Sequence, residues 1–348
     1  MVSLSFRFPH HGKYSSYHRL LDYGAKEDIR VDASLWKAVQ ESSLLNRRGL
    51  ATRTWRKLKE AQAWHLARSR DETWVHYFYP EQGYYRGAKL RRAGQKMLFT
   101  CHLPKEVHER ARTKLLHYAE GLKEADGIIL MAPDDLGYYA EVAPQARVAF
   151  IPHGIDIHRF TPAERRKRKT GEGIDLLTVG NMERDFERLA AVIRQADESD
   201  APLRFNVVAL PHYLDVLKGF TGEKAWRRVN ALSGIDDDAL LELYRSSDML
   251  FLPLRAATAN NALLEALATG LPMLLSDLPA CRAYARDCAI YFPAEEGPGA
   301  LVERMAGTDI AGLREMADAG RALAERELAW EVIAMRRREF MREIDAIA

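Results

Sequence analysis

Residues 257–272 combine residue types that can bind an anionic, hydroxyl-bearing ligand. They read A-T-A-N-N-A-L-L-E-A-L-A-T-G-L-P, follow an apolar strand-like run and open a helical pattern. Backbone N–H groups at a helix N-terminus attract anions, and Asn260 and Asn261 add side-chain donors. Glu265 lies about one turn into the helix, where a carboxylate can accept hydrogen bonds from two ribose hydroxyls. An ordinary strand–helix–strand unit with asparagine caps would have the same pattern.

The surrounding segments alternate between short apolar runs and longer stretches of helical period. The strand-like runs cover residues 75–79, 96–100, 127–131, 175–179, 204–208, 249–252 and 271–275. Continuous apolar strands that alternate with helices are typical of parallel sheets covered by helices on both faces. Because one such series occupies each half of the chain, the sequence predicts an α/β protein with two Rossmann-like domains.

The two halves meet near a polybasic run at residues 165–169, which is followed by Gly171 and Gly173. A dense run of one charge beside glycines is typical of a solvated linker. The expected parts of the chain are a first domain (1–160), a linker (161–173), a second domain (174–330) and a final helix (about 331–348) that completes the first domain.

Composition limits the class of protein. Of the 348 residues, 47% are hydrophobic and 29% are charged, which fits a folded chain rather than a disordered one. The apolar runs are shorter than the ~20 residues of a membrane-spanning helix, and the N-terminus does not resemble a secretory signal. Three cysteines without a C-x-x-C pair exclude a disulfide scaffold. We therefore expect a cytoplasmic protein.

Charge is unevenly distributed along the chain. Residues 1–160 contain 26 Lys and Arg against 18 Asp and Glu, and the remainder contains 25 against 31. Within the basic half, residues 46–70 carry eight basic side chains and one acid, Glu60, with Trp55 and Trp64 interleaved. A basic amphipathic helix with tryptophan suits an anionic membrane surface, but a solvated helix packed on the domain core has the same pattern. No known binding module accompanies this charge, so we expect no nucleic-acid partner.

Five segments carry a resemblance to a known family. Residues 260–272 resemble its nucleotide-sugar-binding motif. Residues 150–156 resemble its interdomain P-N-G-V-D segment, and residues 176–180 resemble the strand that opens its second domain. Residues 240–248 resemble the helix after its base-binding loop, and residues 325–331 resemble the start of its final helix. The family is the family 4-like GT-B glycosyltransferases (glycosyl transferases group 1). The likeness is specific over residues 150–335 and weaker over 1–149.

The resemblance implies a retaining enzyme that moves a sugar from a nucleotide diphosphate sugar to an acceptor hydroxyl. It implies the GT-B fold, in which two Rossmann-like domains face each other across a cleft and the C-terminal helix crosses back to the first domain. UDP-sugars are the expected donors and GDP-sugars the alternative, with no cofactor and no metal. The implied donor-binding residues are Gly180, Asn181, Arg188, Thr258, Ala259, Asn260, Asn261, Leu264 and Glu265, with Glu265 on the ribose.

Three positions depart from the family pattern. Ala257 stands where the family has an acid near the transferred sugar. Asn181 and Phe186 stand where the family places the Arg and Lys that neutralise the diphosphate. We therefore expect Arg184 to act as the substitute cation that stabilises the leaving group, with Arg188 as a second choice.

In the first domain, His102 lies just after a strand, in a segment that resembles the family's T-x-H motif. The resemblance implies that His102 faces the transferred sugar and acts with Arg184 in catalysis, whereas a histidine after a strand is by itself commonly structural. The expected acceptor-side residues are Gly12, Ser15, Ser16 and Tyr17. No acid or cysteine accompanies the nearby His10, His11 and His18, so we expect no metal site there.

The sequence thus predicts a hexosyltransferase of the EC 2.4 class that acts on a glycan or lipid-linked acceptor, in polysaccharide or glycolipid biosynthesis. It would be cytoplasmic or peripheral on the inner face of a membrane, which residues 46–70 would contact. Two alternatives stay open. A nucleotide-sugar epimerase on the same fold would act on the donor alone. A catalytically silent GT-B protein would bind a nucleotide sugar without turnover, as the missing acid and basic pair would suggest.

Overall fold

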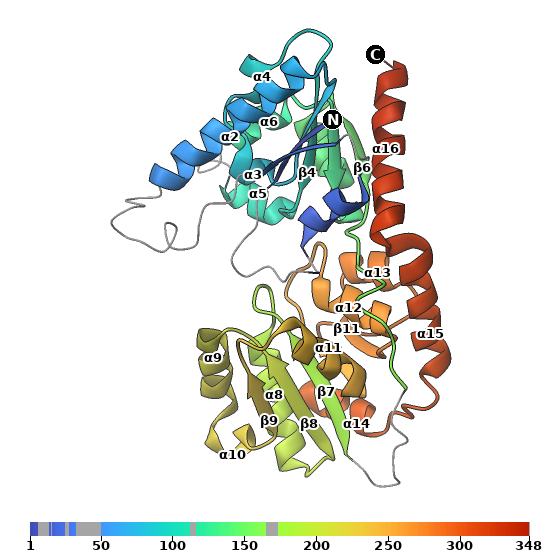
Figure 1. The fold of residues 1–348 in the computed structure, drawn as a ribbon. Helices are drawn as coiled ribbons and strands as arrows, with labels where there is room; N and C mark the ends of the chain where they lie inside the picture. Colours follow the sequence, from blue (N-terminus) through green and yellow to red (C-terminus); the bar gives the residue numbers. More distant parts are fainter. Residues whose placement is uncertain are drawn as a thin grey trace. The chain divides into compact units, whose positions relative to one another are not determined.

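The computed structural model describes residues 1–5, 14, 16–24, 28–32, 50–111, 116–164 and 173–347. The chain divides into two compact units (Figure 1). Unit 1 comprises Met1–Gly154 and Trp330–Ala348, and unit 2 comprises Ile155–Ala329. Each unit contains a six-stranded sheet in which every pairing is parallel, so the predicted α/β class with two Rossmann-like units is confirmed.

The sheet of unit 1 has the strand order β2-β1-β3-β4-β5-β6. Its strands are β1 (Val2–Ser5), β2 (Ile29–Asp32), β3 (Trp74–Tyr77), β4 (Lys96–Cys101), β5 (Gly127–Leu130) and β6 (Arg147–Phe150). Its helices are η1 (Tyr17–Tyr23), α2 (Leu50–Ser69), α3 (Pro80–Gly83), α4 (Gly87–Leu90), α5 (Lys105–Ala111), α6 (Leu116–Leu122), η3 (Pro133–Asp135), α7 (Leu136–Val142) and α16 (Trp330–Ile347). The strands at 75–79, 96–100 and 127–131 are therefore confirmed within one or two residues.

Helix α16 is far from the rest of unit 1 in sequence and packs along its sheet, beside β6 (Figure 1). Gly127 at the start of β5 leaves room for it, because a Cβ there would lie 2.7 Å from the Ile344 side chain. Asp345 accepts a hydrogen bond from Trp74 Nε1 (3.2 Å) and pairs with Lys96 (2.8 Å). The end of the chain is thus fastened to the amino ends of β3 and β4.

The sheet of unit 2 has the strand order β12-β11-β10-β7-β8-β9. Its strands are β7 (Ile174–Val179), β8 (Leu203–Val208), β9 (Val229–Leu232), β10 (Met249–Leu252), β11 (Met273–Ser276) and β12 (Ile290–Phe292). Its helices are α8 (Phe186–Glu198), α9 (Pro211–Thr221), α10 (Glu223–Trp226), α11 (Asp237–Ser246), α12 (Asn261–Thr269), α13 (Pro279–Ala285), α14 (Pro298–Ala306), α15 (Arg314–Leu323) and the π-helix η4 (Ala324–Leu328).

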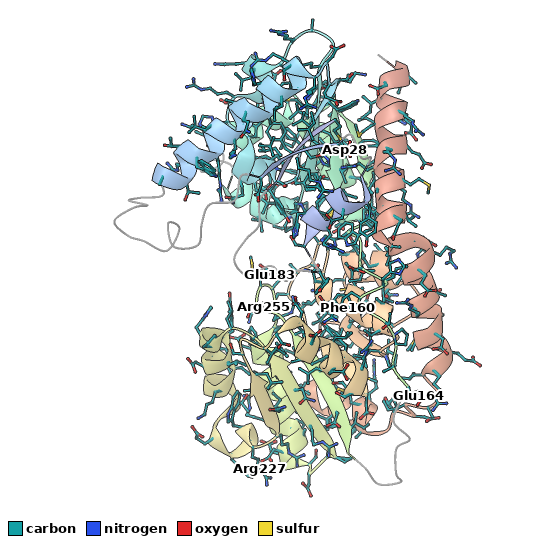
Figure 2. The ribbon with its side chains drawn as sticks, viewed as in Figure 1. Asp28, Phe160, Glu164, Glu183, Arg227 and Arg255 are labelled. Atoms are coloured by element: carbon teal, nitrogen blue, oxygen red, sulfur yellow. The ribbon has the colours of Figure 1, made fainter. Side chains whose placement is uncertain are left out.

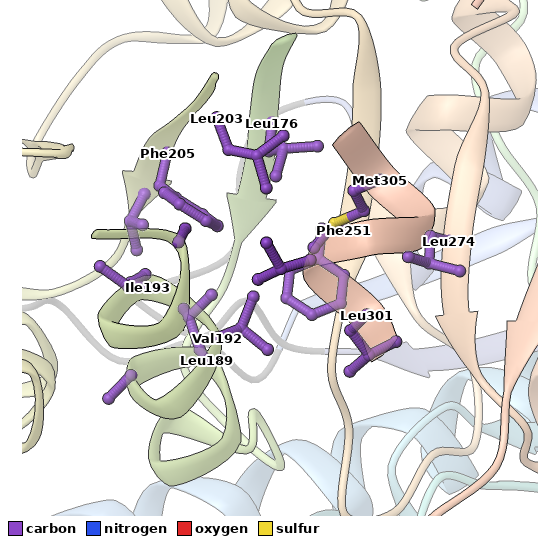
Figure 3. Close-up of a cluster of buried hydrophobic side chains, with 14 of the residues drawn as sticks. Leu176, Leu189, Val192, Ile193, Leu203, Phe205, Phe251, Leu274, Leu301 and Met305 are labelled. Carbon is purple, nitrogen blue, oxygen red and sulfur yellow. The ribbon is translucent and has the colours of Figure 1, made fainter. Parts of the chain in front are cut away.

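The core of unit 2 lies where α8 and α14 pack on the sheet. Leu189, Val192 and Ile193 of α8 meet side chains of the sheet such as Phe205 and Phe251 (Figure 3). The α8 residues follow helical spacing, which places them on one face. This packed layer supports the strands β7 and β10, whose carboxyl ends carry the candidate site.

The boundary between the units lies six residues earlier than the sequence predicts, because residues 155–160 pack with unit 2 rather than with unit 1. Ile155 N–H donates to Leu328 O (2.8 Å). The Arg321 guanidinium donates to the carbonyl of Phe160 (2.6 Å). Of the predicted linker, residues 165–172 lie outside the described part of the chain.

Helix α2 carries most of the predicted basic segment and presents two different faces. Trp64 is fully buried, and its Nε1–H donates to the Tyr77 hydroxyl (2.7 Å), so it faces the core and not a membrane. Glu60 is also buried and accepts from the backbone N–H of Arg86 (3.0 Å) at the start of α4. Leu58 is 60% exposed. Arg53 and Lys57 are exposed as well, so the helix packs on the core with one face and exposes basic side chains on the other. Arg47 and Arg48 lie outside the described residues.

Candidate donor site at the carboxyl ends of β7 and β10

The strand order of unit 2 reverses between β7 and β10, which are paired neighbours at the centre of the sheet. In open parallel sheets, ligands bind outside the carboxyl ends of strands at such a switch point. Here the loops that follow the two strands, 180–185 and 253–260, are hydrogen-bonded to each other. Asp185 N–H donates to Pro253 O (3.0 Å), and Arg255 N–H donates to Glu183 O (3.0 Å). Glu183 and Arg255 lie together at this edge (Figure 2), so the two loops form one surface.

Arg184 is held inside this surface by several acceptors. Its Nε and Nη2 donate to Val179 O (2.9 and 2.7 Å), and its Nη1 donates to Met182 O (3.0 Å). Nη2 also lies 3.4 Å from Asn260 Oδ1. Burial lowers the pKa of Arg184 to about 10, and the Glu265 carboxylate is one of the groups that oppose the shift. Arg184 is therefore still a cation at neutral pH, fixed at the head of α12.

Helix α12 begins at Asn260 and ends at Gly270 for local reasons. Asn260 Oδ1 accepts from the backbone N–H groups of Ala262 (3.1 Å) and Leu263 (3.4 Å), as an N-cap does. Gly270 has φ 63°, the left-handed conformation that terminates a helix. Two of the amides that the sequence suggests for anion binding are thus occupied by the helix's own cap. The helix dipole and the fixed Arg184 remain as sources of positive potential.

Glu265 is buried and lies on α12 opposite Tyr244 of α11. Burial, and next to it the Glu265 carboxylate, raise the pKa of the Tyr244 hydroxyl well above the ordinary 10. Burial likewise raises the pKa of the nearby Cys281 thiol of α13 to about 12, so that this thiol is protonated. The switch point therefore brings the buried Glu265 carboxyl group and the Arg184 guanidinium close to the hydroxyl of Tyr244 and the thiol of Cys281.

The other residues predicted for the donor site differ in how far they are buried. Asn181 Oδ1 accepts from Leu210 N–H (2.7 Å), which ties the loop after β7 to the start of α9. Thr258 and Ala259 are half-buried, Asn261 is exposed at the first turn of α12, and Leu264 is fully buried. These residues line or support the edge formed by the two loops.

Arg188 and Phe186 lie on helix α8 and not in the two loops that form the candidate site. The Arg188 guanidinium donates to the carbonyls of Pro293 (3.2 Å) and Ala294 (2.6 Å) and lies over the Phe292 ring (5.0 Å). It fastens the loop after β12, so the structure does not place it with Arg184. Phe186, at the position of the family's lysine, is buried in the core.

In unit 1, His102 lies at the carboxyl end of β4. Its Nε2–H donates to Phe78 O (2.9 Å), and its ring stacks on Tyr79 (4.3 Å between centroids) and meets Tyr17 edge-on (5.1 Å). The hydrogen bond to a carbonyl places a proton on Nε2, so in the neutral ring Nδ1 is the acceptor nitrogen.

The side chain of Tyr17 does not lie where a residue that contacts an acceptor would have to lie. It is 1% exposed, and its hydroxyl lies 3.3 Å from Thr100 Oγ1. The aromatic rings of His102, His153 and Trp330 surround it, which is why its side chain cannot reach a ligand at the surface. Tyr17 therefore supports His102 from behind. Ser16 is also buried, whereas Gly12 and Ser15, like His10 and His11, lie outside the described residues.

Within the described ranges, no three His, Cys, Asp or Glu side chains are grouped so that they could hold a metal ion. None of the helices described in the structure is both long enough and apolar enough to cross a membrane.

Sequence reasoning did not identify Tyr244 and Arg255 as site residues. Tyr244 occurs in the motif over residues 240–248, but its approach to Glu265 depends on the packing of α11 against α12. Arg255 joins the site through its backbone bond to Glu183. The one feature of the sequence that could have indicated Arg255 is its position directly before the run of small residues at 256–259.

Comparison with known proteins agrees with this architecture. Residues 173–320 match the family model described as glycosyl transferases group 1. The D-inositol 3-phosphate glycosyltransferase of Geodermatophilus obscurus is 26% identical over 253 residues, which are 63% of this chain and 53% of that protein. The chain thus spans about half the length of this curated relative.

Two solved structures share the fold over the whole chain. Sucrose-phosphate synthase from Thermosynechococcus elongatus has a TM-score of 0.73 at 17% identity and covers 100% of this chain and 99% of its own. Anabaena Alr3699/HepE in complex with UDP-glucose has a TM-score of 0.72 at 12% identity and covers 99% and 100%. These likenesses show that the chain has the GT-B fold, and residues 173–320 resemble the group 1 glycosyltransferases.

Proposed function

We propose that this protein transfers a sugar, with retention of configuration, from a nucleotide diphosphate sugar to a hydroxyl of a glycan or lipid-linked acceptor. The observation that carries the proposal is the arrangement of Glu265, Arg184 and Asn260 at the switch point of unit 2. Glu265 would accept hydrogen bonds from the donor ribose, and Arg184 would stabilise charge that develops on the leaving diphosphate. UDP-glucose in the similar HepE structure supports a UDP-sugar as the donor; GDP-sugars are the alternative.

The residues of unit 1 would act on the sugar and the acceptor. His102 would face the transferred sugar, and the hydrogen bond from its Nε2–H to Phe78 O would hold the ring in place. The leaving diphosphate itself would take the proton of the attacking hydroxyl on the same face of the sugar. No side-chain carboxylate is needed for that step, which is consistent with Ala257 in place of the family's acid.

A thermal-shift screen against UDP, GDP, ADP, TDP and CMP nucleotides with their common sugars tests donor binding. A ligand present at 100 times its Kd stabilises the folded state by about 2.7 kcal/mol, which is a measurable shift. Incubation of the stabilising donor with glycans and lipid-linked sugars then tests transfer, and product anomericity tests retention. A donor that is bound but neither transferred nor hydrolysed would support the silent GT-B protein, an alternative favoured by Ala257 and by the occupied amides of α12.

The exposed face of α2 supports a membrane-surface role as part of the same proposal. Arg53 and Lys57 are exposed, as are Arg86 and Lys89 on and beside α4, and α4 packs against α2. The double variant Arg53→Glu/Lys57→Glu should bind less to phosphatidylserine-containing vesicles in sedimentation, since each basic residue near the lipid contributes about 1 kcal/mol. The control Arg314→Glu lies in unit 2. Equal binding by both variants would remove α2 from the proposal.

A further inference from the structure

Unit 1 contains a group of polar side chains buried against its sheet. Ser3 of β1 and His76 of β3 are register partners on adjacent strands, so their side chains project from the same face. Arg337 of α16 lies close enough to His76 to help to lower the pKa of the imidazole. All three residues are 0% exposed.

The hydrogen bonding of this group is incomplete. Arg337 Nη2 donates to Asp28 Oδ2 (3.2 Å), and His76 Nε2 lies 2.8 Å from Thr100 Oγ1. Ser3 Oγ, His76 Nδ1, and both Nε and Nη1 of Arg337 have no hydrogen-bond partner in the described part of the chain. Buried polar atoms are almost always hydrogen-bonded in folded proteins, either to protein or to ordered water. Atoms other than those of the described chain are therefore expected to complete the hydrogen bonding of this group.

The chemistry of the group restricts that ligand. It must accept hydrogen bonds, because the guanidinium of Arg337 can only donate them. The charge of Arg337 is already matched by Asp28, and His76 is neutral, because burial and Arg337 hold its pKa well below the ordinary 6.5. An anion would add an unbalanced charge to the interior, which is costly. A water molecule adds no charge and can accept from Arg337 while it donates to Ser3 Oγ or His76 Nδ1.

We propose that unit 1 binds ordered water between Arg337, His76 and Ser3. The chain of contacts continues from this site through Thr100 Oγ1 to the Tyr17 hydroxyl (2.8 and 3.3 Å), and the Tyr17 ring meets His102. The bound water thus connects the final helix with the residues behind His102. The water site itself is independent of the proposed function, but its effect on sugar transfer rests on that function.

A crystal structure of the full chain at about 1.8 Å or better, with and without a bromide soak, tests the site. We expect at least one water within about 2.7–3.2 Å of Arg337 Nε or Nη1 and of Ser3 Oγ or His76 Nδ1. The proposal is overturned by an anomalous bromide peak at the site, or by Arg337 N–H groups that are satisfied by protein atoms alone. Because this test uses the unaltered protein, it does not depend on whether a variant folds.

The connection to His102 is tested by two substitutions at one position. Thr100→Val removes the hydroxyl but keeps the shape, and Thr100→Ser keeps the hydroxyl. We expect turnover to fall by about threefold to thirtyfold in Thr100→Val, with donor affinity unchanged, and to be largely restored in Thr100→Ser. Equal turnover in both variants would show that the Thr100 hydroxyl does not link the water site to His102. If the unaltered protein transfers no sugar, the proposed function is wrong. The crystal structure would then still test the water site.

Discussion

Gly180 and Arg184 can occupy their positions only because Gly180 has no side chain. A Cβ on Gly180 would lie 2.3 Å from Arg184 Nη2 and 2.7 Å from Arg184 Cζ. Gly180 also has φ 109°, a backbone conformation that other residues rarely adopt. The guanidinium therefore lies directly over the carboxyl end of β7, where it is bound to Val179 O and comes within 3.4 Å of Asn260 Oδ1.

The first prediction concerns this contact. Gly180→Ala should lower the free energy of unfolding by about 1–3 kcal/mol, because the backbone is strained and Arg184 must move. Donor affinity should fall with it. Gly219→Ala is the control, since Gly219 lies in helix α9 with open space around its Cβ position; it should be neutral or stabilise by up to about 1 kcal/mol. Urea unfolding and donor titration measure both effects, and equal stabilities would show that the contact is not made.

The second prediction separates charge from geometry at Arg184. Arg184→Lys keeps a cation but cannot donate to Val179 O and Met182 O together, so turnover should fall by about 100-fold, close to the loss of a transition-state donor. The donor's apparent KM should change less. Arg204→Met, at the amino end of β8 where Arg204 pairs with Asp175, is the control. A rise in KM without a fall in turnover would exclude a transition-state role.

A third prediction concerns Glu265 and Tyr244. Glu265→Gln keeps the shape but removes the charge, so donor affinity should fall by about tenfold to a hundredfold, equivalent to about 1.5–3 kcal/mol. Tyr244→Phe should weaken donor binding by a smaller factor, because it leaves the carboxylate in place. Isothermal titration with the donor nucleotide measures both. Unchanged affinity in a folded Glu265→Gln protein would remove Glu265 from the site.

The fourth prediction tests the role of His102. His102→Ala should lower turnover by about 100-fold, within the usual range for a positioned histidine, while nucleotide binding to unit 2 stays unchanged. The control is His117→Ala, because His117 is an exposed residue of α6. Nucleotide binding can be measured with UDP or GDP alone, so a loss of folding would be detected. Full turnover in His102→Ala would show that the histidine is structural.

A fifth prediction concerns pH and the ion pair between Arg286 and Glu327. The Arg286 guanidinium holds the pKa of the Glu327 carboxyl at about 2, below its ordinary 4.5. A depressed carboxyl pKa stabilises the fold above pH 4.5, and this contribution is lost as the pH falls toward 2. Because Arg286 is half-exposed, we expect Glu327→Gln to cost only about 1 kcal/mol at pH 7.

The stability difference between the original protein and Glu327→Gln should therefore shrink as the pH is lowered from 5 to about 2. Urea unfolding across this range measures it, with Glu303→Gln, an exposed position on α14, as the control. A difference that is constant with pH would show that the ion pair does not contribute.

The sequence by itself determined the α/β architecture and the place of the candidate donor site. Apolar strand runs such as 175–179 and 249–252 need burial on both faces, so their alternation with helices predicts parallel sheets. Asn260 and Gly270 specify the start and the end of α12 through local backbone chemistry, which does not depend on the rest of the fold. These features are short-range, and the structure contains both of them.

Tertiary structure decided which side chains are available to a ligand. Trp64, Tyr17 and Arg188 have residue types that suit a membrane, an acceptor or a diphosphate. The packed structure instead places Trp64 and Tyr17 in the core and binds Arg188 to the carbonyls after β12. Whether an amphipathic side chain faces ligand or core depends on contacts between segments distant in sequence, such as Tyr17 against Trp330. The approach of Tyr244 to Glu265 has the same cause, because it follows from helix packing and not from sequence spacing.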